Sequence, residues 1–335
     1  ANPRILSIIA VNGLGADCVS GGEVQAALDA GFPADKIVFA GVGKADWEIN
    51  LGLDNDIFCF NVESAVELEI INELAAAKHK VASIALRINP EVDAHTHAKI
   101  TTGMKENKFG INLSQLGGVL DKLKEMKHVK LIGIHSHIGS QITDMSSFRN
   151  LVIRFNEIQE ELEAHGVTVE NLNFGGGLGI DYYHPNHLSI PAFDNYFAAI
   201  HKLLQVRPGQ QVHFEPGRSI VAQCGTLISK VLYVKEGETK KFAILDAGFT
   251  ELIRPAMYDA YHRIENISSD EAVETYDVVG PICESSDVFG KDVELNKAHR
   301  GDLIALRSAG AYGEVMASQY NCRHLPKAYY SDTIK

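Results

Sequence analysis

A glycine-rich segment in the middle of the chain has the composition of a turn that binds an anion. Phe174-Gly175-Gly176-Gly177-Leu178-Gly179 directly follows a β-prone run. Glycines of this kind let backbone N–H groups approach an anionic group closely. The segment does not match the dinucleotide-binding fingerprint, because no helix follows at once and Pro185 comes soon after. On its own it is equally typical of a turn with only a structural role.

A second segment, Glu215-Pro216-Gly217-Arg218, places opposite charges on either side of a tight turn at the end of another β-prone run. A salt-bridged turn is one interpretation. The functional interpretation is a carboxylate that faces a ring nitrogen, with a guanidinium that binds a phosphate or a carboxylate.

Two histidines, His135 and His137, follow a third β-prone run, and alternation along a strand directs both to the same face. Metal binding is a weaker interpretation, since no clear third ligand lies nearby in the sequence. We therefore predict no metal site.

The later part of the chain adds polar groups in turn settings. Cys283 and Glu284 follow a Gly-Pro turn, where a thiol beside a carboxylate could serve as an acid. A buried free cysteine is otherwise usually inert. Arg254 and Tyr258 lie in Arg-Pro-Ala-Met-Tyr, and Tyr312 lies in Gly-Ala-Tyr-Gly; each segment alone is typical of an ordinary loop.

The elements that position these residues alternate between short β-prone runs and longer amphipathic stretches up to about residue 215, which predicts parallel βα units. The expected helices are 64–78, 148–165 and 190–205. The expected strands are 17–20, 37–40, 57–61, 83–89, 131–136, 171–174 and 211–215.

Candidate functional residues lie at the ends of many successive strands, which favours a TIM-like (β/α)8 barrel over a doubly wound sheet. The barrel needs eight strands, so we expect its first strand just upstream of Ala1. The runs 225–235, 241–246, 274–279 and 302–307 predict a second, mostly antiparallel β domain. We predict a barrel domain over residues 1–218 and a β-rich domain over residues 219–335.

Composition narrows the class of protein. The 335 residues are 45% hydrophobic and carry a net charge of −12, with no block of Lys and Arg. This argues against a nucleic-acid partner and favours work on small molecules. The five cysteines include no C-x-x-C pair, and no apolar run approaches the length of a membrane span. The opening residues lack the features of a signal peptide, so we expect a cytoplasmic protein without membrane contact.

Taken together, the motifs resemble the diaminopimelate decarboxylase family of fold type III, alanine-racemase-like pyridoxal-phosphate enzymes. The matching stretches occur in family order and span nearly the whole chain: 16–23 (ADCVSGGE), 86–111, 135–141 (HSHIGSQ), 173–181 (NFGGGLGID), 215–218 (EPGR), 245–258, 279–287 (VGPICESSD) and 310–317 (GAYGEVMA).

The resemblance implies pyridoxal 5'-phosphate as the cofactor. His137 is expected to stack on the ring and Glu215 to pair with the ring nitrogen, while backbone of the glycine loop holds the phosphate with Gly217 and Arg218. The residues implied to contact the cofactor are His137, Ser140, Gly175, Gly176, Gly177, Glu215, Gly217, Arg218 and Tyr312.

The resemblance also implies decarboxylation of meso-2,6-diaminopimelate to L-lysine and CO2, the last step of lysine biosynthesis. Cys283 is expected to protonate the carbon that CO2 leaves, and Glu284 to meet the distal ammonium group. The residues implied to contact the substrate are Arg218, Arg254, Tyr258, Glu284 and Tyr312.

Three alternatives remain. Related decarboxylases act on carboxynorspermidine, arginine or ornithine, and the settings of Glu284, Arg254 and Tyr258 favour diaminopimelate over these. An amino-acid racemase on the same barrel is disfavoured by Cys283 and the Glu-Pro-Gly-Arg segment. A relative without activity is disfavoured by the intact set of site residues.

In this family the aldimine lysine lies in Tyr-Ala-x-Lys-Ala-Asn, and the printed sequence starts at the final Ala-Asn as Ala1-Asn2. We therefore expect that lysine immediately before Ala1. The family also builds its active site at a dimer interface, which predicts a homodimer in which the Cys283 segment enters the site of the partner subunit.

Overall fold

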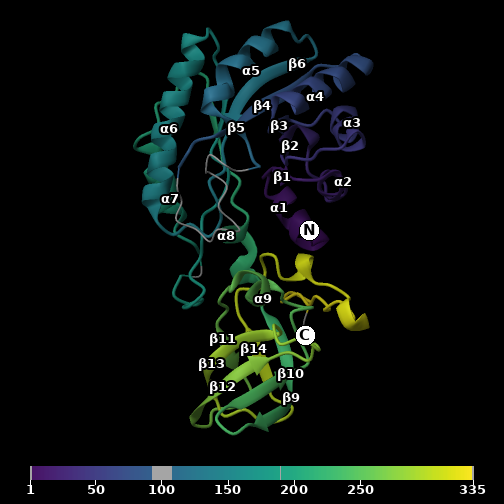
Figure 1. Cartoon of the computed structure of the whole chain (residues 1–335), viewed down its shortest axis with the longest axis vertical. Helices are drawn as coiled ribbons and strands as arrows, with labels where there is room; N and C mark the ends of the chain where they lie inside the picture. The colour runs from purple at the N-terminus through teal and green to yellow at the C-terminus, as the bar shows by residue number, and fades with distance from the viewer. Residues whose placement is uncertain (1, 93–107, 189, 334–335) are drawn as a thin grey trace. The chain divides into compact units, whose positions relative to one another are not determined.

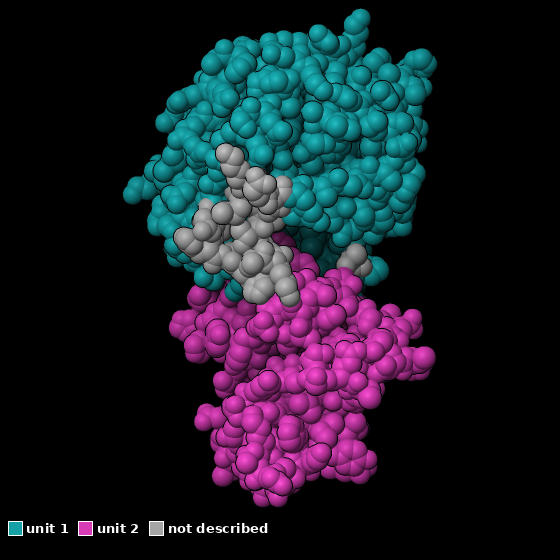
Figure 2. Space-filling view, in the orientation of Figure 1, with its two compact units in different colours: residues 1–178, 193–216 teal, residues 179–192, 217–335 magenta. Residues whose placement is uncertain are grey.

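The structure is a computed structural model that describes residues 2–92, 108–188 and 190–333. The expectations concerning Ala1 and the part of the 86–111 stretch from residue 93 to 107 lie outside the described residues. The chain forms two compact units, coloured separately in Figure 2. The first unit contains Ala1–Leu178 and Phe193–Pro216, and the second contains Gly179–Ala192 and Gly217–Lys335.

The first unit is built on a parallel sheet that curls on itself (Figure 1). Its strand order is β1-β2-β3-β4-β6-β7-β8, and each neighbouring pair is parallel. All the strands predicted between residues 17 and 215 are present, and the short β5, which pairs with β4, was not predicted. The strands are β1 (Ala16–Cys18), β2 (Ile37–Phe39), β3 (Cys59–Val62), β4 (Ala82–Asn89), β5 (Ile111–Asn112), β6 (Val129–His135), β7 (Asn171–Asn173) and β8 (Gln211–His213).

Helices follow the strands and cover the sheet (Figure 1). Several begin at a capping side chain: Ser20 Oγ accepts from the Glu23 N–H and Ser64 Oγ from the Glu67 N–H, each at 3.2 Å. The predicted helix at 190–205 is shorter in the structure, because it starts only after Pro191. The helices are α1 (Pro3–Val11), α2 (Gly21–Asp29), α3 (Asp46–Asp54), α4 (Ala65–Ala77), α5 (Leu113–Glu125), α6 (Met145–Ala164) and α7 (Phe193–His201).

Polar side chains gather where these parallel strands end. Glu63 directly follows β3, Arg87 lies near the end of β4, and His135 and Asn173 are the last residues of β6 and β7. Glu215 follows β8 by two residues. Because carboxyl ends of parallel strands share one rim of a barrel sheet, five elements bring polar groups to the same rim of the first unit.

The second unit is a six-stranded sheet with its own apolar core. Its order is β11-β14-β9-β10-β12-β13, and only β10 and β12 pair in parallel. The predicted α/β class, a barrel-like parallel sheet followed by a mostly antiparallel sheet, is confirmed. The strands β11 and β13 were not predicted. The elements are α8 (Arg218–Val221), β9 (Leu227–Glu236), β10 (Lys241–Leu245), α9 (Arg254–Tyr258), β11 (Ile264–Asn266), β12 (Val273–Val279), β13 (Val288–Asn296) and β14 (Leu303–Leu306).

In the described parts of the chain, no helix combines the length and the apolar composition needed to cross a membrane.

Candidate active site

Glu215 is a buried carboxylate in the first unit, with 7% of its side chain exposed. Its Oε2 lies 3.1 Å from His135 Nε2, and its Oε1 accepts from Asn173 Nδ2 at 2.6 Å. Burial raises the pKa of Glu215, but the charge and hydrogen bond of His135, with His137 and Asn173, outweigh it and lower the pKa to about 2. Glu215 is therefore ionised at neutral pH, and His135 carries a proton on Nε2.

The glycine loop after β7 lies against the backbone of two neighbouring strand ends. A Cβ on Gly175 would be 2.4 Å from the carbonyl oxygen of Ser136, and a Cβ on Gly176 would be 2.2 Å from that of Glu215. Gly175 and Gly177 also have φ values of 65° and 108°, which favour glycine. Only glycine fits at these positions, so the loop packs its backbone directly against the backbone of its neighbours.

His137 is held by this loop. Its Nδ1 accepts a hydrogen bond from the Gly176 N–H at 3.1 Å. Burial, followed by the positive charge of Arg87, lowers the pKa of His137 to about 4. The imidazole is therefore neutral at pH 7, a state suited to stacking on an aromatic ring.

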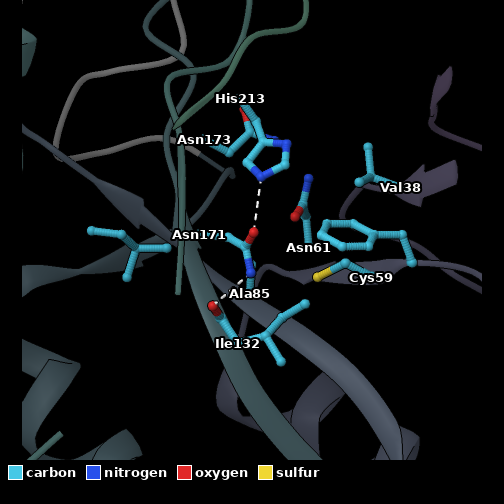
Figure 3. A pocket seen from close by; sticks show the side chains of 10 residues that line it. Val38, Cys59, Asn61, Ala85, Ile132, Asn171, Asn173 and His213 are labelled. Atoms are coloured by element: carbon cyan, nitrogen blue, oxygen red, sulfur yellow. Dashed lines mark hydrogen bonds between the residues drawn. The ribbon is translucent and has the colours of Figure 1, made fainter. Parts of the chain in front are cut away.

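A small cavity lies inside the barrel sheet (Figure 3). Its volume of about 10 Å³ allows one water molecule at most, so it is not the place of a cofactor. His213 Nε2 lies 2.8 Å from Asn171 Oδ1, and Asn171 Nδ2 donates to the carbonyl of Ile132 at 3.1 Å. Asn173, which also lines the cavity, donates to Glu215. Asn173 therefore connects the lining of the cavity to the Glu215 carboxylate.

A second cluster, in the second unit, contains two buried guanidinium groups. Arg218 is 6% exposed and Arg254 is 5% exposed. Both donate to the hydroxyl of Tyr182, from Nη1 at 2.7 Å and 3.1 Å respectively. Arg254 Nη1 also lies 2.9 Å from His262 Nε2, and the Arg218 guanidinium lies 5.1 Å from the centre of the Tyr312 ring.

Arg254 has no carboxylate within ion-pair distance among the residues that the structure describes. A buried cation without a counter-charge is costly, so this cluster is suited to an anionic ligand. The first residues of α8 and α9 are Arg218 and Arg254, which positions both guanidinium groups through short helices.

The Cys283–Ser286 turn between β12 and β13 is exposed. Tyr320 donates its hydroxyl hydrogen to Glu284 Oε1 at 2.7 Å. The turn ends at the buried Asp287, which accepts the N–H groups of Phe249 and Ile282, both at 2.7 Å. Burial raises the pKa of Asp287 above its usual value, because it outweighs these two hydrogen bonds, which lower the pKa.

The predicted site residues thus divide between the units. The first unit brings Glu215, His137 and the glycine loop together, and the second brings Arg218, Arg254 and Tyr312 together. Ser140 and Tyr258 are half-buried, while Gly217, Cys283 and Glu284 are exposed. The structure adds five residues to the site residues predicted from the sequence: His135, Asn173, Tyr182, His262 and Asp287.

Little in the sequence singles out those additional residues. His135 stands in a recognised motif, but alternation does not say what either histidine contacts. Tyr182 comes one residue after the glycine-rich motif, and His262 comes four residues after the Arg254–Tyr258 segment. Both lie outside the motifs, and only the fold brings them to Arg254.

The comparison with known families agrees with the geometry. Residues 1–222 match the model of the pyridoxal-dependent decarboxylase, pyridoxal binding domain. This is well over half of the chain, so the chain belongs to the pyridoxal-dependent decarboxylase family. The diaminopimelate decarboxylase of Bacteroides thetaiotaomicron is 67% identical over 334 residues, which are 100% of this chain and 86% of that protein. Within the family, the chain is therefore placed among the diaminopimelate decarboxylases.

Solved structures support the same placement. Diaminopimelate decarboxylase from Helicobacter pylori, complexed with L-lysine, matches with a TM-score of 0.90 and 42% identity over 96% of this chain and 79% of that one. The enzyme from M. jannaschii, in co-complex with L-lysine, matches with a TM-score of 0.88 and 41% identity over 96% and 75%. The predicted family and fold are confirmed.

The residues of the first unit fit pyridoxal phosphate, the cofactor of this family. A buried, ionised carboxylate suits a protonated ring nitrogen, and a neutral imidazole suits the ring face. The glycine loop, where a Cβ would collide with neighbouring backbone, lets an anion approach its backbone closely.

Proposed function

We propose that this chain decarboxylates meso-2,6-diaminopimelate to L-lysine and CO2, with pyridoxal phosphate as cofactor. The observation that carries the proposal is the buried, ionised Glu215 beside the glycine loop and His137. The proposal assigns cofactor binding to a domain of residues 1–218 and substrate and dimer contacts to residues 219–335.

On the cofactor side, the bound pyridinium ring supplies a sink for the electrons that remain when CO2 leaves. Glu215 keeps the proton on the ring nitrogen, because an adjacent negative charge raises the proton affinity there. His135 and Asn173 hold the Glu215 carboxylate in place and keep it ionised. His137 covers the ring face, and the backbone around Gly175–Gly177 holds the phosphate, together with Gly217 and Arg218.

On the substrate side, Arg254 and Tyr258 bind the distal carboxylate, and Arg218 and Tyr312 contact both substrate and cofactor. Glu284 binds the distal ammonium group. Ornithine has no distal carboxylate and would leave the buried Arg254 without its anion, which disfavours that substrate. Cys283 supplies the proton to the carbon that has lost CO2.

The proposal includes a homodimer with shared sites, in which Cys283 and Glu284 enter the site of the partner subunit. The exposure of this turn supports it, since a turn that reaches another subunit must be accessible in the single chain. We also propose that the protein works in the cytoplasm, where its cysteines stay reduced.

The purified holoenzyme should release CO2 from meso-diaminopimelate and yield L-lysine. Parallel assays measure the rate of CO2 release from ornithine, arginine and carboxynorspermidine. A protein that released CO2 faster from one of these, or that changed optical rotation of an amino acid without CO2, would overturn the proposal.

A further inference from the structure

The buried imidazole of His262 lies directly behind Arg254 in the second unit. His262 is 1% exposed. Its Nε2 is 2.9 Å from Arg254 Nη1, and its Nδ1 is 2.9 Å from the carbonyl oxygen of Arg307. The ring also packs edge-on against Tyr182, with ring centres 5.2 Å apart. Both nitrogens of His262 therefore have a defined partner.

These partners determine where the proton of His262 lies. A guanidinium only donates hydrogen bonds, so His262 Nε2 must accept from Arg254. The proton is then on Nδ1, which donates to the carbonyl of Arg307. A proton on Nε2 would remove the acceptor, and protonation of both nitrogens would also place a second cation against Arg254. Burial, with the charges of Arg254 and Arg218, lowers the pKa of His262 to about 4, so the imidazole is neutral at pH 7.

The same contacts orient Arg254. Its Nη1 meets two acceptors, the Tyr182 hydroxyl and His262 Nε2, which together account for both of its hydrogens. Among the described residues, Nε and Nη2 of Arg254 meet no acceptor. An arginine held by one terminal nitrogen presents this opposite edge as a planar fork, the geometry that binds a carboxylate through two parallel hydrogen bonds.

We propose that His262 is a positioning residue, which with Tyr182 aims the free edge of Arg254 at the distal carboxylate of the substrate. The inference rests on the proposed role of Arg254 in substrate binding. A residue that only filled the core would need no acceptor toward a guanidinium, whereas His262 supplies one at hydrogen-bond distance. Its effect should therefore depend on whether the ligand carries that carboxylate.

Two ligands separate this role from a general effect on the fold. L-lysine keeps the distal carboxylate, and 1,5-diaminopentane has the same carbon chain and both amines without it. Two variants of similar polarity test the contact itself. In His262→Gln the amide oxygen can reach Arg254 as Nε2 does, whereas in His262→Asn the shorter amide reaches only toward the Arg307 carbonyl.

The dissociation constants of both ligands are to be measured calorimetrically on each holoenzyme. We expect His262→Asn to weaken L-lysine binding about tenfold, since a hydrogen bond to a charged group is lost, and to leave diaminopentane binding within about twofold. His262→Gln should keep L-lysine binding within about threefold of the unaltered protein. In steady-state assays, His262→Asn should raise KM for diaminopimelate more than it lowers kcat.

Arg254→Met tests the underlying assignment separately. Unchanged L-lysine binding in Arg254→Met would refute the role of Arg254 in the proposed function. Weaker L-lysine binding in Arg254→Met, with no difference between His262→Asn and His262→Gln, would refute the positioning role alone. Equal weakening of both ligands in His262→Asn would show a structural effect and would also overturn it.

Discussion

At the scale of single residues, the two units differ in how fully a buried charged side chain is hydrogen-bonded. Glu215 is ionised because His135 and Asn173 donate to it, and the carboxylate is satisfied before any ligand arrives. Arg254 is only partly satisfied, by the Tyr182 hydroxyl and His262. The first arrangement preserves a fixed negative charge, and the second prepares a site for an anion.

Replacing Glu215 tests the fixed charge. Glu215→Gln keeps the size of the side chain and one acceptor oxygen but removes the anion, so the ring nitrogen would lose its proton. We expect kcat to fall by about 100-fold or more, a loss of about 2.7 kcal/mol or more of transition-state stabilisation. Visible absorbance should show that cofactor is still bound. Near-normal kcat with bound cofactor would remove Glu215 from the proposed mechanism.

Cys283→Ala tests the proposed proton donor. Because the thiol is exposed and lies in a turn held by Asp287, its removal should leave the fold and the cofactor absorbance intact. The decarboxylation rate should nevertheless fall sharply, as loss of a positioned general acid costs about 100- to 10,000-fold. Cys224→Ala, at another exposed cysteine, is the control. An unchanged rate in Cys283→Ala would exclude Cys283 from the chemistry.

Two histidines whose pKa values are lowered in the folded protein make its stability depend on pH. The pKa values of His137 and His262 are lowered from 6.5 to about 4, so the unfolded chain binds protons more readily as the pH falls below 6.5. The free energy of unfolding should therefore decrease between pH 6.5 and about 4, by up to about 3 kcal/mol for each histidine. Urea titrations at several pH values measure this decrease. His262→Gln should make the decrease smaller, and an equal slope in that variant would contradict the assignment to His262.

At the scale of elements, the strand-end loops depend on glycine at positions where backbones touch. Gly176→Ala would place a Cβ 2.2 Å from the Glu215 carbonyl oxygen, so the glycine loop or the end of β8 must shift. We expect a loss of about 1–3 kcal/mol in the free energy of unfolding, with weaker cofactor retention. The matched control is Gly118→Ala in α5, where a Cβ meets no atom within 4 Å and helix propensity favours alanine. Equal stability of the two variants would contradict this account.

Much of this element pattern was predictable. Buried parallel strands appear in the sequence as short apolar runs, and every strand predicted between residues 17 and 215 is present. The two-residue β5 was missed because so short a pairing leaves no periodic signal. β13 was missed because its buried positions are few and irregular, and Asp292 in its middle has a φ of 51°. A strand interrupted in this way has no clean alternation of polar and apolar residues.

The candidate site was predictable to the extent that its residues stand in motifs. Glu215, the glycine loop and Arg254 could be named, because their types and order are distinctive. Tyr182 and His262 could not, since a tyrosine and a histidine in loops give no sign that both will contact the same guanidinium. Their role depends on pairings between residues 72 and 8 positions apart, which only the folded unit determines.

At the scale of the whole molecule, the proposed shared site makes a prediction about assembly. Light scattering at micromolar concentration should show a dimer, and a fully active monomer would contradict the proposal. A stronger test uses two inactive variants, Cys283→Ala and Glu215→Gln, which alter different parts of the site. If Cys283 acts in the site of the partner, a mixed dimer has one site with both alterations and one site with neither.

Mixing the two variants should therefore restore activity. With random reassembly at equal amounts, half of the dimers are mixed and each has one intact site, so about a quarter of the unaltered activity is expected. Each variant alone, taken through the same dissociation and reassembly, is the control. If Cys283 acted in its own subunit, each chain would carry one defect into its own site, and the mixture would stay as inactive as its components. Recovery therefore distinguishes a shared site from two independent ones, whatever the size of each single defect.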